Sequence, residues 1–297
     1  MNHSSDTPAA GPAPAFEVLR PAQQTVPLVL SSPHSGRDYP ASFIAAARLD
    51  PAALRSSEDC FVDELFAAAP SCGAPLLRAR FPRAFVDANR EVYELDPAMF
   101  DGPLPPYVNT RSARVRAGLG TIARVVASGA EIYRGKLSFA EAKARIRNFH
   151  QPYHAALAGL IRATTARFGF AVLLDCHSMP SIGGPMDRDP GAPRVDVVLG
   201  DRFGTSCEAR ITATAERVLE ARGYVVQRNA PYAGGYTIAR YGRPCAAVHA
   251  LQIEINRALY MDEDRLERGP RLAAVAADMT ALIEALARLD PVAQAAE

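Results

Sequence analysis

The strongest constraint on the fold of this chain is the alternation of short apolar segments with longer amphipathic ones. The short segments are rich in β-branched residues and cover 26–30, 75–80, 84–88, 170–175, 194–199, 224–227 and 247–255. The longer segments have the Ala, Leu, Arg and Glu content of amphipathic helices and cover 139–167, 206–222 and 264–289. Strands that alternate with helices indicate an α/β fold, a three-layer α/β/α sandwich around a mixed, mostly parallel sheet.

The length and composition favour one domain. With 297 residues, of which 48% are hydrophobic and 22% charged, the chain can form a full-sized core. We expect a single domain over 16–297, preceded by a disordered lead at 1–15 that is rich in Pro, Ala and Gly. The stretch 98–134 is rich in Pro, Gly and Arg without a clear period, which predicts a long surface excursion of the kind that is often functional.

The charge and the apolar runs exclude several classes of partner. A net charge of +1 leaves no large field for nucleic acid or an anionic membrane, so we expect a small-molecule partner. No apolar run approaches the roughly 18 residues that span a bilayer. The amino terminus resembles no secretory signal, and the five scattered cysteines support neither a disulfide framework nor a thiolate zinc site. Cytoplasmic location is the simplest expectation, and the oligomeric state stays open, a homo-oligomer included.

Three polar residues lie at or near the ends of predicted strands. His34 follows the strand at 26–30, His177 follows the strand at 170–175, and Glu254 lies within the last strand. Ligands in α/β folds bind beyond the carboxyl ends of the strands, so these side chains are candidates for one site. Asp175 is placed to orient His177 as a carboxylate orients a metal-binding imidazole. Taken alone, each histidine is more often a surface or buried structural residue, and Glu254 is equally explained by a buried ion pair.

Two histidines at strand ends need an oxygen ligand to complete a catalytic zinc site of the His₂-carboxylate type. The adjacent carboxylates Glu58 and Asp59 stand just ahead of a predicted helix at 61–69 and are both candidates. Acidic residues at a helix start also complement the helix dipole, which would account for one of the two without a metal.

Further polar residues suit substrate binding. Arg83, Asn89 and Arg90 cluster in the sequence, and an arginine fork matches a carboxylate with two hydrogen bonds. His150 and His154 have the spacing of a zincin motif, but Gln151 replaces the glutamate that such a motif needs. We interpret this segment as a helix start, with His154 as a candidate that faces the cleft.

Taken together, the motifs resemble the N-formylglutamate amidohydrolase family from about residue 26 to residue 264. The matching stretches are PLVLSSPHSG, EDCFVDELF, RARFPRAFVDANR, QPYHAAL, LLDCHS, GGYTIARYGRP and VHALQIEINRALYMDE. The weakest match is 98–134. The family is similar in architecture to zinc carboxypeptidases and aspartoacylase.

The resemblance implies a role for each candidate. His34, His177 and one acidic residue would bind one Zn²⁺ or another divalent metal, and the family pattern favours Asp59, while the carboxypeptidase relatives keep Glu58 as the alternative. Asn89 and Arg90, with Arg83 or Arg243, would bind the carboxylates of the substrate. Glu254 would be the general base.

The implied reaction is zinc-dependent hydrolysis of N-formyl-L-glutamate to formate and L-glutamate, a step that fits histidine catabolism. A related deacylase for another N-acyl acidic amino acid is the nearest alternative, because no feature of the sequence measures the acyl pocket. A non-catalytic sensor of an acidic metabolite is the alternative from another class. The combination of His34, Asp59, His177 and Glu254 argues against the sensor, since a sensor needs no base beside a metal.

Overall fold

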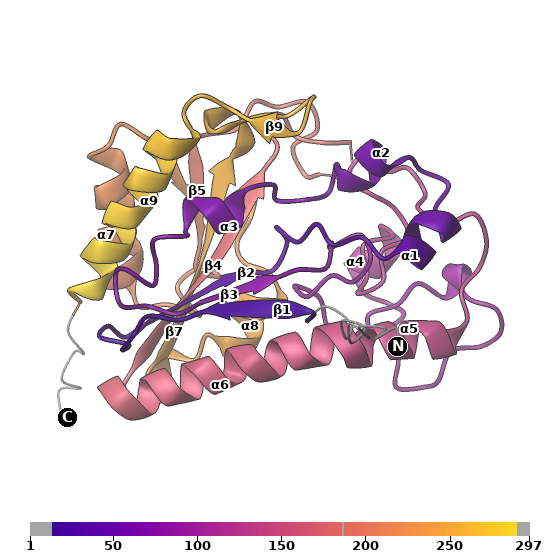
Figure 1. The fold of residues 1–297 in the computed structure, drawn as a ribbon, viewed down its shortest axis with the longest axis horizontal. Helices are drawn as coiled ribbons and strands as arrows, with labels where there is room; N and C mark the ends of the chain where they lie inside the picture. Colours follow the sequence, from indigo (N-terminus) through magenta and orange to yellow (C-terminus); the bar gives the residue numbers. More distant parts are fainter. Residues whose placement is uncertain (1–13, 186, 290–297) are drawn as a thin grey trace, which may run out of the picture.

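A seven-stranded sheet runs through the middle of the computed structural model and carries helices on both faces (Figure 1). The structure describes residues 14–185 and 187–289, so most of the predicted lead at 1–15 lies outside the described residues. The strand order is β1-β3-β2-β4-β7-β5-β6. The bounds of these strands are Phe16–Leu19 (β1), Leu28–Ser32 (β2), Leu76–Ala79 (β3), Ala171–Met179 (β4), Val197–Gly200 (β5), Val226–Arg228 (β6) and Val248–Asn256 (β7).

The pairing confirms the predicted α/β fold with a mixed, mostly parallel sheet. Parallel pairs join β3 to β2, β2 to β4, β4 to β7 and β5 to β6. Only β1 with β3 and β5 with β7 pair antiparallel. The central strands β4 and β7 are buried along almost their whole length, as expected for strands covered on both faces. A small hairpin, β8 (Met261–Asp262) and β9 (Glu267–Arg268), lies outside this sheet.

The helices form the two outer layers. One layer contains α6 (Gln151–Phe168) and α8 (Tyr236–Tyr241), and the other contains α3 (Val62–Leu65), α7 (Ala209–Glu220) and α9 (Leu272–Ala287) (Figure 1). The shorter helices are α1 (Ala41–Ala46), α2 (Pro51–Arg55), α4 (Ala113–Arg116), α5 (Phe139–Arg145) and the 3₁₀ turns Pro97–Met99, Pro244–Ala246 and Arg257–Leu259. No helix among residues 14–185 and 187–289 is long and apolar enough to cross a membrane.

The helix predicted at 139–167 is one continuous rod with an irregular middle. A π-helical turn, Ile146–His150, joins α5 to α6, and Pro152 stands in the first turn of α6. Proline lacks the N–H that would donate to a carbonyl of the preceding turn, so it interrupts the regular ladder of hydrogen bonds next to the π-helical turn. The motif around His150 therefore does mark the start of α6, although the chain is already helical before it.

The apolar residues of the central strands alternate between the two layers. Leu28 and Leu30 of β2 pack toward α3, α7 and α9, whereas Val29 packs toward α6. The same alternation holds in β4, where Val172 and Leu174 join the first cluster and Leu173 joins the second. Each central strand thus contributes to both cores, which is the reason that its sequence is apolar without interruption.

Two sequence expectations need correction. The segment 84–88 is not a strand, because the N–H groups of Phe85 and Val86 both donate to the carbonyl of Pro82 and close a turn. The stretch 98–134 has little regular structure, as expected, but it does more than cross the surface. Its apolar side chains pack into the α6-side core, among them Val108, Ile122, Val126 and Ile132.

Candidate active site

The polar side chains of β4 and β7 share one face of the sheet at its carboxyl end. Leu173, Asp175 and His177 alternate along β4, and Leu173 packs in the α6-side core. Ala250, Gln252 and Glu254 alternate along β7 in the same way, and His177 is the register partner of Glu254. Toward the carboxyl end, polar residues therefore replace apolar ones on the α6 side of the sheet. His177 and Glu254 thus lie at the carboxyl end of the sheet, where the sequence predicts the candidate site.

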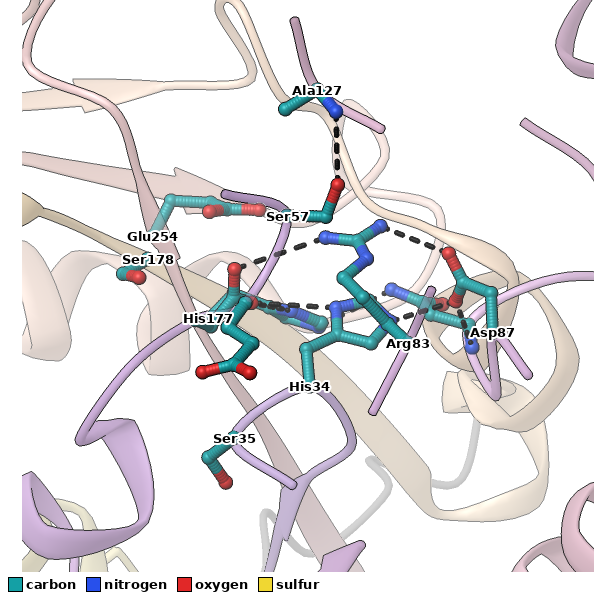
Figure 2. A network of polar contacts seen from close by, with 12 residues as sticks. His34, Ser35, Ser57, Arg83, Asp87, Ala127, His177, Ser178 and Glu254 are labelled. Atoms are coloured by element: carbon teal, nitrogen blue, oxygen red, sulfur yellow. Dashed lines mark hydrogen bonds and ion pairs between the residues drawn. The ribbon is translucent and has the colours of Figure 1, made fainter. Parts of the chain in front are cut away.

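His34, Asp59 and His177 converge at this end of the sheet. Nδ1 of His177 lies 3.0 Å from Oδ2 of Asp59, and Nδ1 of His34 lies 3.3 Å from the same oxygen. The two imidazole rings are 4.8 Å apart and tilted by 58° (Figure 2). All three residues are buried, and one ligand atom from each lies within 4.8 Å of the others. Two nitrogens and one oxygen at this separation can bind one metal ion.

The outer nitrogens of both imidazoles contact carboxylates. Nε2 of His34 lies 2.7 Å from Oδ1 of Asp87, and Nε2 of His177 lies 2.9 Å from Oδ2 of Asp175. A carboxylate in this position accepts a hydrogen bond from the Nε2–H group and so fixes the tautomer in which the Nδ1 lone pair is free for a metal. Nδ1 of His34 is buried without a hydrogen-bond partner within the described part of the chain. A buried nitrogen of this kind fits a metal ligand.

Asp59 is held by arginines on its other side. Nη2 of Arg257 donates to Oδ1 of Asp59 at 3.0 Å, and Nη1 of Arg83 lies 3.8 Å from that oxygen. Although burial alone would raise the pKa of Asp59, its contacts with His177 and His34 and the nearby charge of Arg83 hold that pKa well below its ordinary value. Asp59 is therefore an anion whose Oδ2 faces the two histidines.

Glu58 turns away from the histidines. Its carboxylate accepts hydrogen bonds from the Tyr39 hydroxyl at 2.6 Å and from Nε of Arg55 at 3.1 Å. Cys60 also contacts this carboxylate through its thiol. The geometry therefore brings Asp59, and not Glu58, to the candidate metal centre.

Glu254 is buried beside this centre, and its neighbour Gln252 orients it. The N–H of Gly235 donates to Oε1 of Gln252 at 2.7 Å, which directs the amide nitrogen of Gln252 toward Oε1 of Glu254, also at 2.7 Å. Burial raises the pKa of Glu254 to about 7. A carboxylate with a pKa near neutrality is suited to exchange protons with a reacting group.

These residues line a cavity of about 650 Å³ that arginines also enter. Arg83 donates to Oδ2 of Asp87 at 2.9 Å and stands between Asp59 and Asp87 (Figure 2). Arg90 donates to the backbone carbonyls of Leu119 and Asn89. Asn89 accepts the N–H of Thr237 at 2.8 Å, and its amide nitrogen lies 3.2 Å from Nε2 of His177.

The structure places Arg243 and His154 outside the residues that line the cavity. Arg243 is exposed and pairs with Val248 at the amino end of β7, the opposite end of the strand from Glu254. His154 is buried in α6, where Nε2 lies 2.7 Å from the carbonyl oxygen of Ala88 and Nδ1 lies 3.0 Å from the Tyr241 hydroxyl.

Sequence reasoning missed three residues that shape the site. Asp87, Gln252 and Arg257 each contact one of the candidate residues through a side chain. Gln252 carries a usable signal, because it stands two residues before Glu254 and so shares its face of the strand. Asp87 and Arg257 carry no local signal for their contacts with the metal-binding candidates, since Asp87 lies 53 residues from His34 and Arg257 lies 198 residues from Asp59.

The chain is similar to known proteins over most of its length. The family model for N-formylglutamate amidohydrolase matches residues 26–261. N-formylglutamate deformylase of Pseudomonas aeruginosa is 33% identical over 251 residues, which cover 83% of this chain and 86% of the relative. The deformylase of Pseudomonas putida is 28% identical over 250 residues, with the same coverage.

Solved structures extend the likeness to three dimensions. The crystal structure of N-formylglutamate amidohydrolase from Ralstonia eutropha JMP134 is 41% identical, has a TM-score of 0.85, and is matched over 92% of this chain and 97% of that one. The gene product Atu2144 from Agrobacterium tumefaciens has a similar fold, with a TM-score of 0.60 and 19% identity over 92% of this chain and 95% of that one. The match over residues 26–261 and the 33% identity to a curated relative lead to one conclusion: the chain belongs to the N-formylglutamate amidohydrolase family.

Proposed function

We propose that this protein hydrolyses N-formyl-L-glutamate to formate and L-glutamate, with zinc bound by His34, Asp59 and His177. The observation that carries the proposal is the convergence of two imidazole nitrogens and one carboxylate oxygen beside Glu254 in a cavity lined by arginines. The names of the relatives from Pseudomonas and Ralstonia supply the substrate. Formate and glutamate as products suit a catabolic step such as histidine breakdown, which we expect in the cytoplasm.

The donor set supports zinc as the metal. Two histidines and one carboxylate, each histidine backed by a second carboxylate, are typical of catalytic zinc sites that keep one position open. When bound, such an ion polarises a carbonyl group and activates water. Arg257 neutralises Oδ1 of Asp59, so this carboxylate offers one oxygen, Oδ2, to the metal.

Glu254 is the proposed general base. Its carboxylate accepts a proton from the attacking water as the water oxygen bonds to the formyl carbon. The same proton then passes to the leaving nitrogen as the carbon–nitrogen bond breaks. Gln252 engages Oε1 of Glu254, which leaves Oε2 for this transfer.

Arg90 is the proposed partner of a substrate carboxylate, and Asn89 and Arg83 flank it. Arg83 already donates to Asp87, and the amide oxygen of Asn89 already accepts from Thr237. We therefore assign the direct charged contact to Arg90, which donates hydrogen bonds to backbone carbonyls. Holding the carboxylate orients the amide for attack.

A panel of N-formyl, N-acetyl and N-succinyl derivatives of Glu and Asp, assayed with and without added Zn²⁺, tests the function. We expect the highest kcat/KM for N-formyl-L-glutamate and a loss of activity after chelation. A higher kcat/KM for an N-acetyl or N-succinyl substrate would instead favour a related deacylase. Metal content without hydrolysis of any member of the panel would favour a sensor.

Glu254→Gln tests the general base, because it preserves the shape of the side chain and removes the proton acceptor. We expect kcat to fall by roughly 10²–10⁴, the range that general-base catalysis contributes, while the zinc content stays at one per chain. Glu263→Gln is a control that changes the same residue type outside the cavity lining. A Glu254→Gln protein that binds zinc and turns over at the wild-type rate would remove Glu254 from the mechanism.

A further inference from the structure

Arg114 enters the same cavity from a part of the chain that lies far from the strands. It belongs to the short helix α4, within the irregular stretch 98–134, and it lines the cavity together with Arg90. Its side chain forms no hydrogen bond or ion pair with another residue of the described ranges 14–185 and 187–289. Arg116, on the same helix, lies outside the cavity lining, and its guanidinium donates to the carbonyl of Arg111.

Hydrogen bonds tie the backbone of Arg114 to the side chain of Arg90. The N–H of Leu119 donates to the carbonyl of Arg114 at 2.8 Å, and the carbonyl of Leu119 accepts Nε of Arg90, also at 2.8 Å. The residues that follow Leu119 are also attached to the segment around Arg90, since the N–H of Asp87 donates to the carbonyl of Thr121 at 2.8 Å. The position of Arg114 relative to Arg90 is therefore set by the fold.

Carboxylates pair less closely with these two arginines than with Arg257 and Arg83. Arg257 pairs with Asp59 at 3.0 Å and Arg83 pairs with Asp87 at 2.9 Å, whereas Arg90 approaches Asp87 only to 3.7 Å. Burial, with the neighbouring positive charges of Arg114 and Arg83, lowers the pKa of Arg90 to about 10. Guanidinium groups that gather in one cavity repel one another, and an anion bound between them relieves that repulsion.

We propose that Arg114 binds the side-chain carboxylate of N-formylglutamate while Arg90 binds the α-carboxylate, an assignment that rests on the proposed function. The order of contacts supports this division. Asp87 contacts both His34 and Arg90, whereas Leu119 connects Arg90 to the backbone of Arg114, and within the described residues no hydrogen bond or ion pair joins Arg114 to His34, Asp59 or His177. In the substrate, the α-carboxylate is attached next to the amide nitrogen, and the side-chain carboxylate is two methylene groups further away.

The stretch 98–134 thereby acquires a role in substrate choice. A site built to pair a carboxylate discriminates strongly against an uncharged analogue, because its charged groups would then stay unpaired. Arg114 would make the enzyme prefer N-formylglutamate to N-formylglutamine, which differs only by an amide in place of the side-chain carboxylate.

The test compares kcat/KM for N-formyl-L-glutamate and N-formyl-L-glutamine in the zinc-loaded protein. We expect Arg114→Ala to lower kcat/KM for N-formylglutamate by roughly 10–100-fold, as for the loss of one charged hydrogen-bonded pair, and to change that for N-formylglutamine by less than about threefold. Arg90→Ala should lower both, because both substrates carry the α-carboxylate. Arg116→Ala is the matched control and should change neither.

The ratio of the two kcat/KM values protects the test against partial misfolding, because an inactive fraction of protein lowers both values equally. Arg114→Lys, which keeps the charge and loses the fork, should fall between the wild type and Arg114→Ala. An unchanged ratio in Arg114→Ala would overturn the assignment, as would a selective loss in Arg202→Ala, which alters another arginine of the cavity. If the wild-type protein hydrolyses neither substrate, the proposed function itself fails.

Discussion

His154 holds three parts of the fold together through contacts that suit an uncharged imidazole. It links α6 to the carbonyl of Ala88 in the turn beside Asn89, and to Tyr241 at the end of α8. Burial, together with the neighbouring His150, lowers the pKa of His154 to about 3. Its ordinary value is about 6.5, so the unfolded chain binds a proton at mildly acidic pH that the folded chain does not.

The stability of the protein should therefore fall as the pH falls from about 6.5 toward 3, because each unit of pKa difference is worth about 1.4 kcal/mol. We expect His154→Gln to weaken this dependence on pH. Between pH 7 and pH 5, the free energy of unfolding should drop by at least about 1 kcal/mol less in the variant than in the wild type. Urea unfolding at both pH values measures it. Parallel pH profiles for wild type and variant would show that His154 is not the residue responsible.

At the scale of the elements, the loop before α8 is packed tightly against Asn89. A Cβ atom added at Gly235 would lie 2.3–2.7 Å from the side-chain amide of Asn89, which is too close for any real contact. The N–H of Gly235 also orients Gln252. A side chain at position 235 would therefore displace Asn89 and also disturb Gln252, the hydrogen-bond partner of Glu254.

Gly235→Ala should accordingly reduce kcat/KM by at least about tenfold, since a displacement of about 1 Å in a positioning group can cost up to about a hundredfold. Gly159→Ala in α6 is the matched control, because a Cβ atom there meets nothing within 4 Å. It should raise the free energy of unfolding by about 0.5–1 kcal/mol and leave kcat/KM unchanged. Equal activities of the two variants would contradict the packing argument.

The central strands and the candidate residues at their ends could be predicted because both depend on the local sequence pattern. The apolar runs of β4 and β7 exceed what a loop would carry, and His34, His177 and Glu254 stand where parallel strands end. The segment 84–88 was mispredicted because its composition suits a strand, whereas the hydrogen bonds to Pro82 decide its conformation. The positions of Arg257 and Arg114 in the site depend on segments that are distant in the sequence and close in space. A local sequence pattern does not predict such contacts.

For the molecule as a whole, a bound metal should stabilise the folded state. The three donors come from separate segments at 34, 59 and 177, so the unfolded chain does not present them together. A ligand at a hundred times its Kd stabilises a protein by about 2.7 kcal/mol, which corresponds to a rise in Tm of roughly 5 °C for a domain of this size.

Calorimetry of the chelator-treated protein, before and after addition of Zn²⁺, measures this rise. Asp59→Ala removes the carboxylate that faces both histidines and should abolish the rise without preventing folding. A zinc-dependent increase of the same size in that variant would place the stabilising ion elsewhere.

The strand order has a consequence for synthesis on the ribosome. In the sheet, β7 lies between β4 and β5. The strands β1 to β4 on one side and β5 and β6 on the other are therefore joined by hydrogen bonds to β7, which ends at Asn256. Until translation has passed that residue, the nascent chain carries β4 with one bare, apolar edge, which is a template for pairing with other chains. We therefore expect a chain released before β7 to aggregate and to need a chaperone to stay dispersed. Glu254, the proposed base, lies in the same late strand, so it is synthesised together with the strand that completes the sheet.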